Sequence, residues 1–212
     1  MPLSPRPILA LDTGVGASAC LCLEDGRVFS ATMKTPRAHS RELLPMLQNL
    51  LQSHGVSWHD LQAFAVSTGP GSFTGLRVAC ATIAGLNASL QKPVFGLSSL
   101  AITALQADTL APIWAIEDAR SGLVYAVQYE QGQCLTAPQC LSWEEFLSFK
   151  PSAYISISNV PVELHSWEAL SVKKSREQAL IQAVSAISDA AEHALWVEPL
   201  YLQVSQAEKN LA

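Results

Sequence analysis

The sequence has few charged residues and no cluster of basic ones. Only 15% of its 212 residues are charged, and 13 Lys and Arg against 18 Asp and Glu give a net charge of −5 with His neutral. A protein that binds a nucleic-acid backbone on its own usually carries a basic stripe, so independent nucleic-acid binding is not expected. The 49% of hydrophobic residues instead predict a well-packed globular protein, part of whose surface is covered by a partner.

Three further absences narrow the class of protein. The five cysteines show no CxxC spacing, so we interpret them as buried apolar residues in a reducing compartment. The five histidines include no HxxxH pair, and no metal site is predicted. The first residues lack the apolar core of a signal peptide, and no apolar run reaches the roughly 20 residues of a membrane span. We therefore expect a cytoplasmic protein that does not cross a membrane.

What the sequence does contain is a repeat about half the chain long. Residues 8–28 read ILALDTGVGASACLCLEDGRV, and a later segment reads IWAIEDARSGLVYAVQYEQGQC. In each, an apolar run reaches an aspartate, Asp12 or Asp118, and a second apolar run leads to a turn at Gly26 or Gly132. Both pairs lie 106 residues apart (118 − 12 and 132 − 26), which predicts two similar halves.

The order of the predicted elements agrees with this repeat. Each half begins with three short strands and continues with alternating helices and strands, the order of a ribonuclease-H-like lobe. Two such lobes make the α/β architecture of actin, Hsp70 and the sugar kinases. We predict lobes at residues 1–107 and 108–212, with the last residues able to pack back on the first lobe. The predicted strands are 8–12, 17–23, 27–33, 63–67, 93–96, 112–117, 123–129, 133–136, 154–158 and 197–202, and the predicted helices are 39–53, 74–90, 98–107, 142–149 and 175–195.

The most unusual string, GPGSFTGLR, lies between the strand at 63–67 and the next helix. Its glycines allow positive φ and close backbone approach, and Ser72 or Thr74 can cap the helix. One hypothesis is a phosphate cradle at the helix N-terminus; the other, which we favour, is a tight strand-to-helix connection. A Walker A loop is excluded because Gly75 is followed by Leu76 and not by Lys. This motif loop consists of Gly69, Pro70, Gly71, Ser72, Phe73, Thr74, Gly75 and Arg77.

The helices before and after this loop are unusually apolar. Arg77 is the only charged residue between Thr74 and Leu90, and small residues recur there at helical spacing. A helix that is apolar nearly all round is buried nearly all round, and its own sheet covers one side. Either the two helices bury each other within one domain, or a partner helix pair covers them. The residues predicted to contact such a partner are His39, Leu43, Leu44, Leu47, Leu50, Leu51, Leu76, Ala79, Cys80, Ile83 and Ala84.

Five strings closely resemble the TsaB (YeaZ) family: ILALDT at 8–13, HSRELLPML at 39–47, GPGSFTGLRVA at 69–79, DARSGLVY at 118–125 and PLYL at 199–202. The resemblance implies a two-lobed actin-like (ASKHA) fold without catalytic activity of its own. It also implies a scaffold role in forming N6-threonylcarbamoyladenosine in tRNA. The scaffold would bind the catalytic subunit TsaD through the helices near 39–53 and 74–90, and the ATPase TsaE and tRNA would join only that complex. Without TsaD, the same helix face would be free to form a homodimer.

The sequence departs from the usual family pattern at three positions. Ala79, Leu123 and Gln203 stand where Gly, an acidic residue and Arg are common.

The resemblance to actin-like enzymes also bears on nucleotide binding. Asp12, Thr13 and Gly14 keep the first phosphate hairpin of that class and form a candidate vestigial nucleotide site. The second hairpin carries Ala119 and Arg120 where the class has a D-x-G turn. We therefore expect no cofactor and no catalytic residue.

Two other functions are considered. An independent nucleotide-dependent enzyme of the sugar-kinase type would need an open ATP cleft between the lobes. An aspartic protease is suggested by Leu11-Asp12-Thr13-Gly14, which matches the residues of that active site. The retroviral-type protease fold is almost all strand and about half this length, so the helices predicted after residue 38 argue against it.

Overall fold

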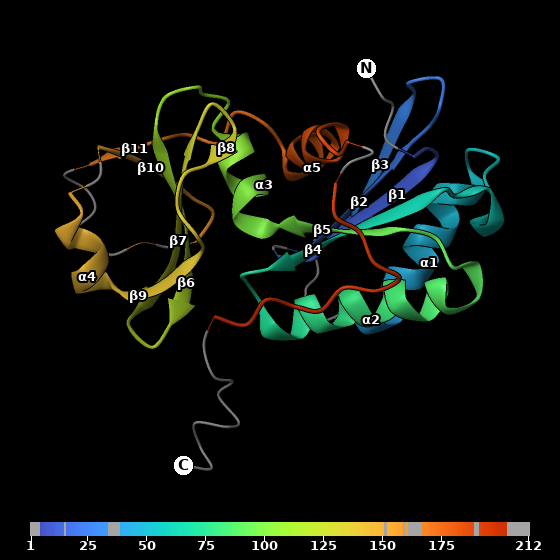
Figure 1. Ribbon diagram of the computed structural model, residues 1–212, viewed down its shortest axis with the longest axis horizontal. Helices are drawn as coiled ribbons and strands as arrows, with labels where there is room; N and C mark the ends of the chain where they lie inside the picture. The colour runs from blue at the N-terminus through green and yellow to red at the C-terminus, as the bar shows by residue number, and fades with distance from the viewer. Residues whose placement is uncertain are drawn as a thin grey trace, which may run out of the picture.

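The chain folds into two β-sheets that lie side by side, with helices packed against them (Figure 1). The computed structural model describes residues 5–14, 16–33, 39–150, 152–158, 160, 167–188 and 191–202. The strands are β1 (Ile8–Asp12), β2 (Ala17–Cys22), β3 (Val28–Met33), β4 (Ala63–Gly69), β5 (Val94–Ser98), β6 (Ile113–Arg120), β7 (Leu123–Glu130), β8 (Gln133–Cys134), β9 (Gln139–Ser142), β10 (Ala153–Ser156) and β11 (Glu168–Ala169). The helices are α1 (His39–Gln52), the 3-10 helix η2 (Trp58–Asp60), α2 (Phe73–Leu90), α3 (Ser99–Gln106), α4 (Trp143–Ser148) and α5 (Arg176–Ser185).

The two sheets have the same strand order, as the repeat predicts. The first sheet runs β3-β2-β1-β4-β5 and the second β11-β10-β6-β7-β8, with β9 also paired to β7. In the first, β1 is antiparallel to β2 and parallel to β4. In the second, β6 is antiparallel to β7 and parallel to β10. Asp12 and Asp118 therefore occupy equivalent positions near the ends of equivalent strands.

The first sheet is buried on both faces because helices cover each of them. Side chains of β1 alternate between two hydrophobic clusters, with Leu9 and Leu11 on one face and Ile8 and Ala10 on the other. The helices α1 and α2 cover the first of these faces, and α3 and α5 cover the second. The resulting three layers explain why every residue of β1 and β2 is buried.

Helix α3 lies between the two sheets and packs on both. Its Ile102 belongs to the cluster under the first sheet, whereas Leu100 and Ala104 belong to the cluster of the second. The segment at the predicted boundary near residue 107 therefore connects halves that share a core helix. The division into folding units at 1–107 and 108–212 stays a prediction.

Most predicted elements are present, but two at the end of the chain were wrong. The predicted helix 175–195 ends at Ser185, and 197–202 forms no strand. Instead, Ala194 crosses to the open edge of β5, where Val94 and Ala194 exchange two backbone hydrogen bonds of 2.8 and 3.1 Å. Ile187 and Ala191 still pack against the cluster under the first sheet, so the pairing of this edge replaces a helix that local sequence would allow to continue. The following residues lie over α2 (Figure 1), and the Leu200 amide donates to the Thr68 carbonyl at 2.7 Å.

Helix α2 is long and apolar enough, by length and composition, to cross a membrane. Its buried residues, among them Ala79, Cys80 and Ile83, instead pack on the first sheet. One side of α2 therefore belongs to the core of the first sheet, while residues on another side, such as Ala81 and Gly85, are exposed.

Candidate functional site

The motif loop joins β4 to α2 through a close contact of two backbones. A Cβ atom at Gly75 would lie 2.7 Å from the Thr13 carbonyl oxygen, so only glycine lets α2 begin this close to the end of β1. Gly69 has a φ of +114°, a conformation that favours glycine. The Ser72 hydroxyl accepts a hydrogen bond of 3.3 Å from the Gly75 amide and caps the helix. These contacts explain the glycines through packing alone, without an anion.

Four residues of the loop are exposed. These are Ser72, Phe73, Thr74 and Arg77, whereas Gly69, Pro70 and Gly75 are buried. The Phe73 ring stacks on Tyr201 with 4.7 Å between centroids, and the Arg77 guanidinium lies 5.2 Å from the Phe73 centroid on the ring face. The loop thus contributes an aromatic stack at the N-terminal end of α2.

The two glycines of α2 predict opposite effects for the same substitution. Gly75→Ala should lower the free energy of unfolding by about 1–3 kcal/mol, because the new methyl group clashes with the Thr13 carbonyl. Gly85→Ala should raise it by about 0.5–1 kcal/mol, because a Cβ there meets nothing within 4 Å and alanine favours the helix. Urea unfolding of both variants measures the difference, and equal effects would show that the Thr13 contact does not constrain the loop.

Asp12, the last residue of β1, is held by Arg176, the first residue of α5. The Asp12 side chain is fully buried, and its Oδ2 accepts a hydrogen bond of 2.7 Å from the Arg176 Nε. Burial alone would raise the pKa of Asp12, but the Arg176 guanidinium and hydrogen bonds from Ser67 and Gly14 hold it below its usual value. The carboxylate is therefore ionised and paired.

The remaining donors of Arg176 bind α3. The Nη1 donates to the Thr103 hydroxyl at 2.7 Å and to the Gln106 Oε1 at 3.3 Å, and the Nη2 donates to the Ser99 carbonyl at 3.2 Å. Through this one side chain, the start of α5 is tied to both β1 and α3. The guanidinium also occupies the space beside Gly14, where its Nη2 would lie 3.1 Å from an added Cβ.

Glu117 of β6 faces the same region from the second sheet. It is 8% exposed, and its Oε2 has no hydrogen-bond partner in the structure. Burial raises the pKa of Glu117 to about 7; nearby Arg176 opposes this rise, and Asp12 and Asp118 add to it. The buried hydroxyls of Thr13 and Ser99 are also without a partner.

Sequence reasoning found the first part of this cluster and missed the rest. Asp12, Thr13 and Gly14 were predicted as a vestigial nucleotide site, and the structure places all three beside a buried arginine. No local signal pointed to Arg176 or Glu117, which are distant in sequence and meet Asp12 only through the fold. In the part of the chain that the structure describes, no three His, Cys, Asp or Glu side chains gather as a metal site would require.

The raised pKa of Glu117 predicts a pH-dependent stability. Because the folded state binds this proton more tightly than the unfolded state, the stabilisation is complete below about pH 4.5 and is lost as the pH rises through about 7. Glu117→Gln, which carries no charge at any pH, should therefore gain up to about 3 kcal/mol over the natural chain between pH 4.5 and 8. Urea unfolding across this range tests it, with Glu24→Gln at an exposed position as the control.

The apolar residues of the helix pair are mostly inside the chain's own core. Among the residues predicted to contact a partner, Leu44 is 48% exposed and Ala84 is half-buried. His39 begins α1, but its side chain lies outside the described residues. The others are buried, all except Leu76 within the cluster on the first sheet, so they position the helices and are not themselves open to a partner: Leu43, Leu47, Leu50, Leu51, Leu76, Ala79, Cys80 and Ile83.

A different set of side chains forms the outer surface of the helix pair. On α2, the exposed Ala81, Gly85 and Ala88 share one side of the helix. On α1, Leu44 and Gln48 lie one turn apart at that surface, exposed and half-buried respectively. We call these five residues the outer helix face. In the sequence, the α2 part of the outer helix face was indicated only by small residues at helical spacing.

Comparison with known proteins places this geometry in a family. The sequence profile described as TsaD, tRNA N6-adenosine threonylcarbamoyltransferase, matches residues 33–207. The tRNA threonylcarbamoyladenosine biosynthesis protein TsaB of Escherichia coli K12 is 36% identical over 129 residues, which is 59% of this chain and 56% of that protein. TsaB of Haemophilus influenzae is 31% identical over 145 residues, 66% of this chain and 61% of that protein. The chain belongs to the TsaB (YeaZ) family, within the proteins that share the TsaD profile.

Solved structures agree with this membership over nearly the whole chain. YeaZ from Pseudomonas aeruginosa superposes with a TM-score of 0.71 and 28% identity, covering 92% of this chain and 99% of that one. The predicted α/β, two-lobed actin-like fold is thereby confirmed. The curated TsaB proteins are matched over less than two thirds of their own length, 56% and 61% in the two cases above.

A second P. aeruginosa structure, with a TM-score of 0.73, is described as an uncharacterized protein with similarity to peptidase YEAZ. In this TsaB-family chain, the Asp12 carboxylate of the LDTG string is fully buried and ion-paired. The helices α1 and α2 also exclude the nearly all-strand fold of a retroviral-type protease.

Proposed function

We propose that the chain is a scaffold subunit in the formation of N6-threonylcarbamoyladenosine in tRNA, and that it binds a TsaD catalytic subunit through the outer helix face. The family membership supports the pathway, since curated relatives carry the name tRNA threonylcarbamoyladenosine biosynthesis protein. The match to a TsaD profile supports a partner of the same fold, because related subunits often pair through equivalent surfaces. The scaffold role and the binding of TsaD are argued from the outer helix face.

The observation that carries the proposal is Gly85. Glycine in the middle of a helix costs roughly 0.5–1 kcal/mol relative to alanine. A Cβ at Gly85 would meet nothing within 4 Å, so the packing of this chain alone does not require a glycine at this position. Flanked by Ala81 and Ala88, both exposed, the glycine would let the backbone of a partner helix approach closely. A counterpart helix pair from TsaD satisfies this requirement.

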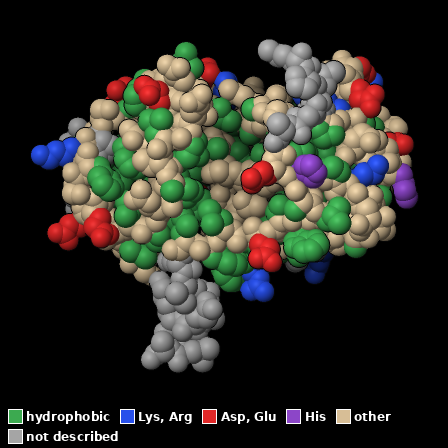
Figure 2. All heavy atoms as spheres, in the orientation of Figure 1, with side chains coloured by type: hydrophobic (Ala, Val, Ile, Leu, Met, Phe, Trp, Pro, Cys, Tyr) green, Lys and Arg blue, Asp and Glu red, His purple; other side chains and the backbone are tan. Residues whose placement is uncertain are grey.

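Apolar residues beside α2 enlarge the surface available to a partner. Trp196, Leu200 and Tyr201 are 61%, 40% and 46% exposed, in the segment that lies over α2. Figure 2 shows exposed hydrophobic side chains in this part of the molecule, with few and scattered basic ones on the same face. An apolar, weakly charged surface suits a protein partner better than the tRNA backbone. We therefore infer that tRNA binds only the assembled complex, which also includes the ATPase TsaE.

The paired state of Asp12 supports an accessory role over an independent enzyme of the sugar-kinase type. In such enzymes this carboxylate would help to position metal and phosphate, whereas Asp12 is fully buried against Arg176. We propose that the subunit acts without a cofactor or catalytic residue of its own, in the cytoplasm. The homodimer predicted through α1 and α2 in the absence of TsaD belongs to the same proposal, because that surface would then be unoccupied.

Co-expression with the TsaD of the same organism tests the proposal. The two chains should co-elute in size-exclusion chromatography, and threonylcarbamoyladenosine should form on tRNA only when both are present with TsaE. Micromolar binding of ATP and magnesium with turnover by the isolated chain would instead favour the kinase function. Failure to co-elute, with both proteins folded, would overturn the scaffold role.

A further inference from the structure

One edge of the first sheet is formed by β3. In the described residues β3 pairs with β2 and has no strand on its other side. Its six residues, VFSATM, include no charge and no proline. Exposed sheet edges in natural proteins are usually protected by charges, proline or bulges, since unpaired backbone groups otherwise recruit another strand. This edge is therefore built to accept a strand.

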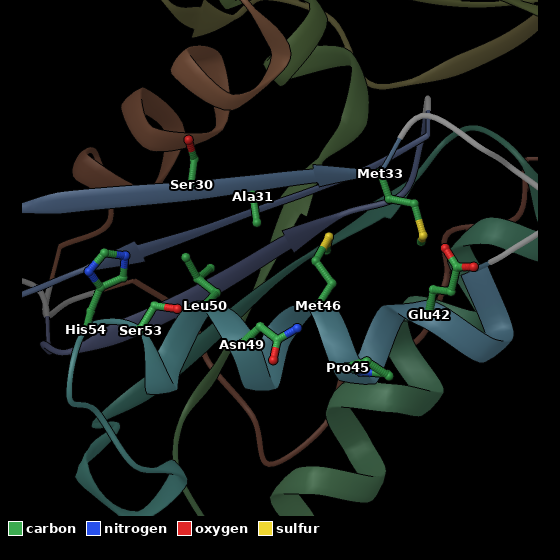
Figure 3. Close-up of a pocket in the computed structure, with 10 residues that line it drawn as sticks. All are labelled: Ser30, Ala31, Met33, Glu42, Pro45, Met46, Asn49, Leu50, Ser53 and His54. Carbon is green, nitrogen blue, oxygen red and sulfur yellow. The ribbon is translucent and has the colours of Figure 1, made fainter.

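A groove runs beneath this edge, between β3 and α1, and has a volume of about 510 Å³ (Figure 3). Figure 3 shows Ala31 and Met33 directed from the strand toward α1, where Met46 and Leu50 form the opposite wall. Methionine side chains are flexible and adapt to different apolar partners. A strand added at the edge would therefore place alternate side chains over an apolar groove.

The two ends of the groove carry different ionisable groups. Glu42 lies at the end near Met33, and His54 lies at the other end (Figure 3). The His54 ring stacks on Phe29 at 3.5 Å between centroids, which fixes its place beside the start of β3. Glu42 is exposed and His54 is half-buried. A carboxylate that accepts hydrogen bonds at one end and an imidazole ring that can donate one at the other make the groove complementary to an inverted copy of itself.

We propose that β3 pairs with β3 of a second copy of this chain, antiparallel and about a two-fold axis at Ala31. Residues directly opposite each other in an antiparallel pair share a face of the sheet. This register therefore places Phe29 opposite Met33 on the groove side and Ser30 opposite Thr32 on the other. The axis also reverses α1, so that Glu42 of each copy meets His54 of the other, twice per dimer.

This surface is separate from the outer helix face. Glu42 and Met46 lie on the side of α1 next to β3, whereas Leu44 and Gln48 lie on the outer helix face. The two contacts can therefore be occupied at once, and they can be disrupted one at a time. The dimer differs from the one predicted through α1 and α2, which would compete with TsaD.

Sedimentation equilibrium of the full chain tests the inference. The natural chain should reach twice its 22.8 kDa mass as its concentration rises over about a hundred-fold range. Thr32→Lys, at an exposed position of β3, should still bind TsaD. Ala81→Arg, which blocks the dimer through α1 and α2, should still dimerise through β3, and adding Thr32→Lys to it should leave a monomer. A natural chain that stays monomeric at all concentrations overturns the inference.

A charge exchange tests the register and does not depend on how well Thr32→Lys folds. His54→Glu should weaken dimerisation at least about ten-fold, because two carboxylates then face each other. Glu42→Lys should weaken it because the acceptor opposite the His54 ring is lost. The double variant should recover most of that loss, since the introduced lysine and glutamate then have opposite charges across the axis. Circular dichroism checks that all three fold. A double variant no better than either single one would overturn the proposed pairing.

Discussion

Arg176→Met should lower the free energy of unfolding by about 3–5 kcal/mol, a large share of the stability of a domain. The substitution keeps most of the apolar stem but leaves the Asp12 carboxylate buried without its cation. It also removes the donors to Thr103, Gln106 and the Ser99 carbonyl. An uncompensated buried charge is costly because the interior solvates it poorly. Urea unfolding monitored by circular dichroism gives the difference.

The same substitution at an exposed ion pair is the control. Arg27 Nε lies 2.7 Å from Asp25 Oδ2, the same distance as in the buried pair, but the two side chains are 65% and 52% exposed. Arg27→Met should therefore cost less than about 1 kcal/mol. Combining Arg176→Met with Asp12→Asn should restore part of the loss, since the unpaired charge is gone. Equal effects at the two sites would mean that Arg176 does not hold β1, α3 and α5 together.

Ala81→Arg should weaken TsaD binding at least about 100-fold, which corresponds to about 2.7 kcal/mol. A long charged side chain at the centre of the outer helix face would hold the two helix pairs apart or bury an unpaired charge. Because Ala81 is exposed in the free chain, the variant should fold with nearly natural stability. Isothermal titration of the variant with TsaD measures the loss.

Ala137→Arg provides the matched control, with the same substitution and charge at an exposed loop position between β8 and β9. Its affinity for TsaD should equal that of the natural chain. Gly85→Ala adds a finer test, because it should stabilise the free chain and yet weaken the complex. If Ala81→Arg binds TsaD normally while Ala137→Arg does not, the contact lies on the second sheet.

The repeat was visible in the sequence because its spacing survives in short, strongly patterned strands. Asp12 and Asp118, 106 residues apart, both fall near the ends of central strands with the same neighbours on either side. Hairpin strands and the apolar helices were found because local patterns determine them. β11, with only two residues, is held by pairing with β10 and leaves no pattern of its own.

The features that could not be predicted from the sequence depend on contacts between residues far apart in the chain. The end of α5 at Ser185 depends on Ala194 reaching Val94, a contact between opposite halves of the chain. The partner of Asp12 is 164 residues away, so no local sequence motif could identify Arg176 as that partner. The apolar stripe of α1 and α2 was recognised, but periodicity alone did not tell which side faces the sheet. The large leucines face inward, and the small residues of α2 remain outside.

Hydrogen exchange on the natural chain, with and without TsaD, tests the central claim most directly. The account predicts slower exchange in the peptides of α1 and α2 and in the segment over α2 once TsaD is bound, while α4 and α5 keep their rates. Formation of a complex in which α1 and α2 exchange as fast as in the free chain would contradict it.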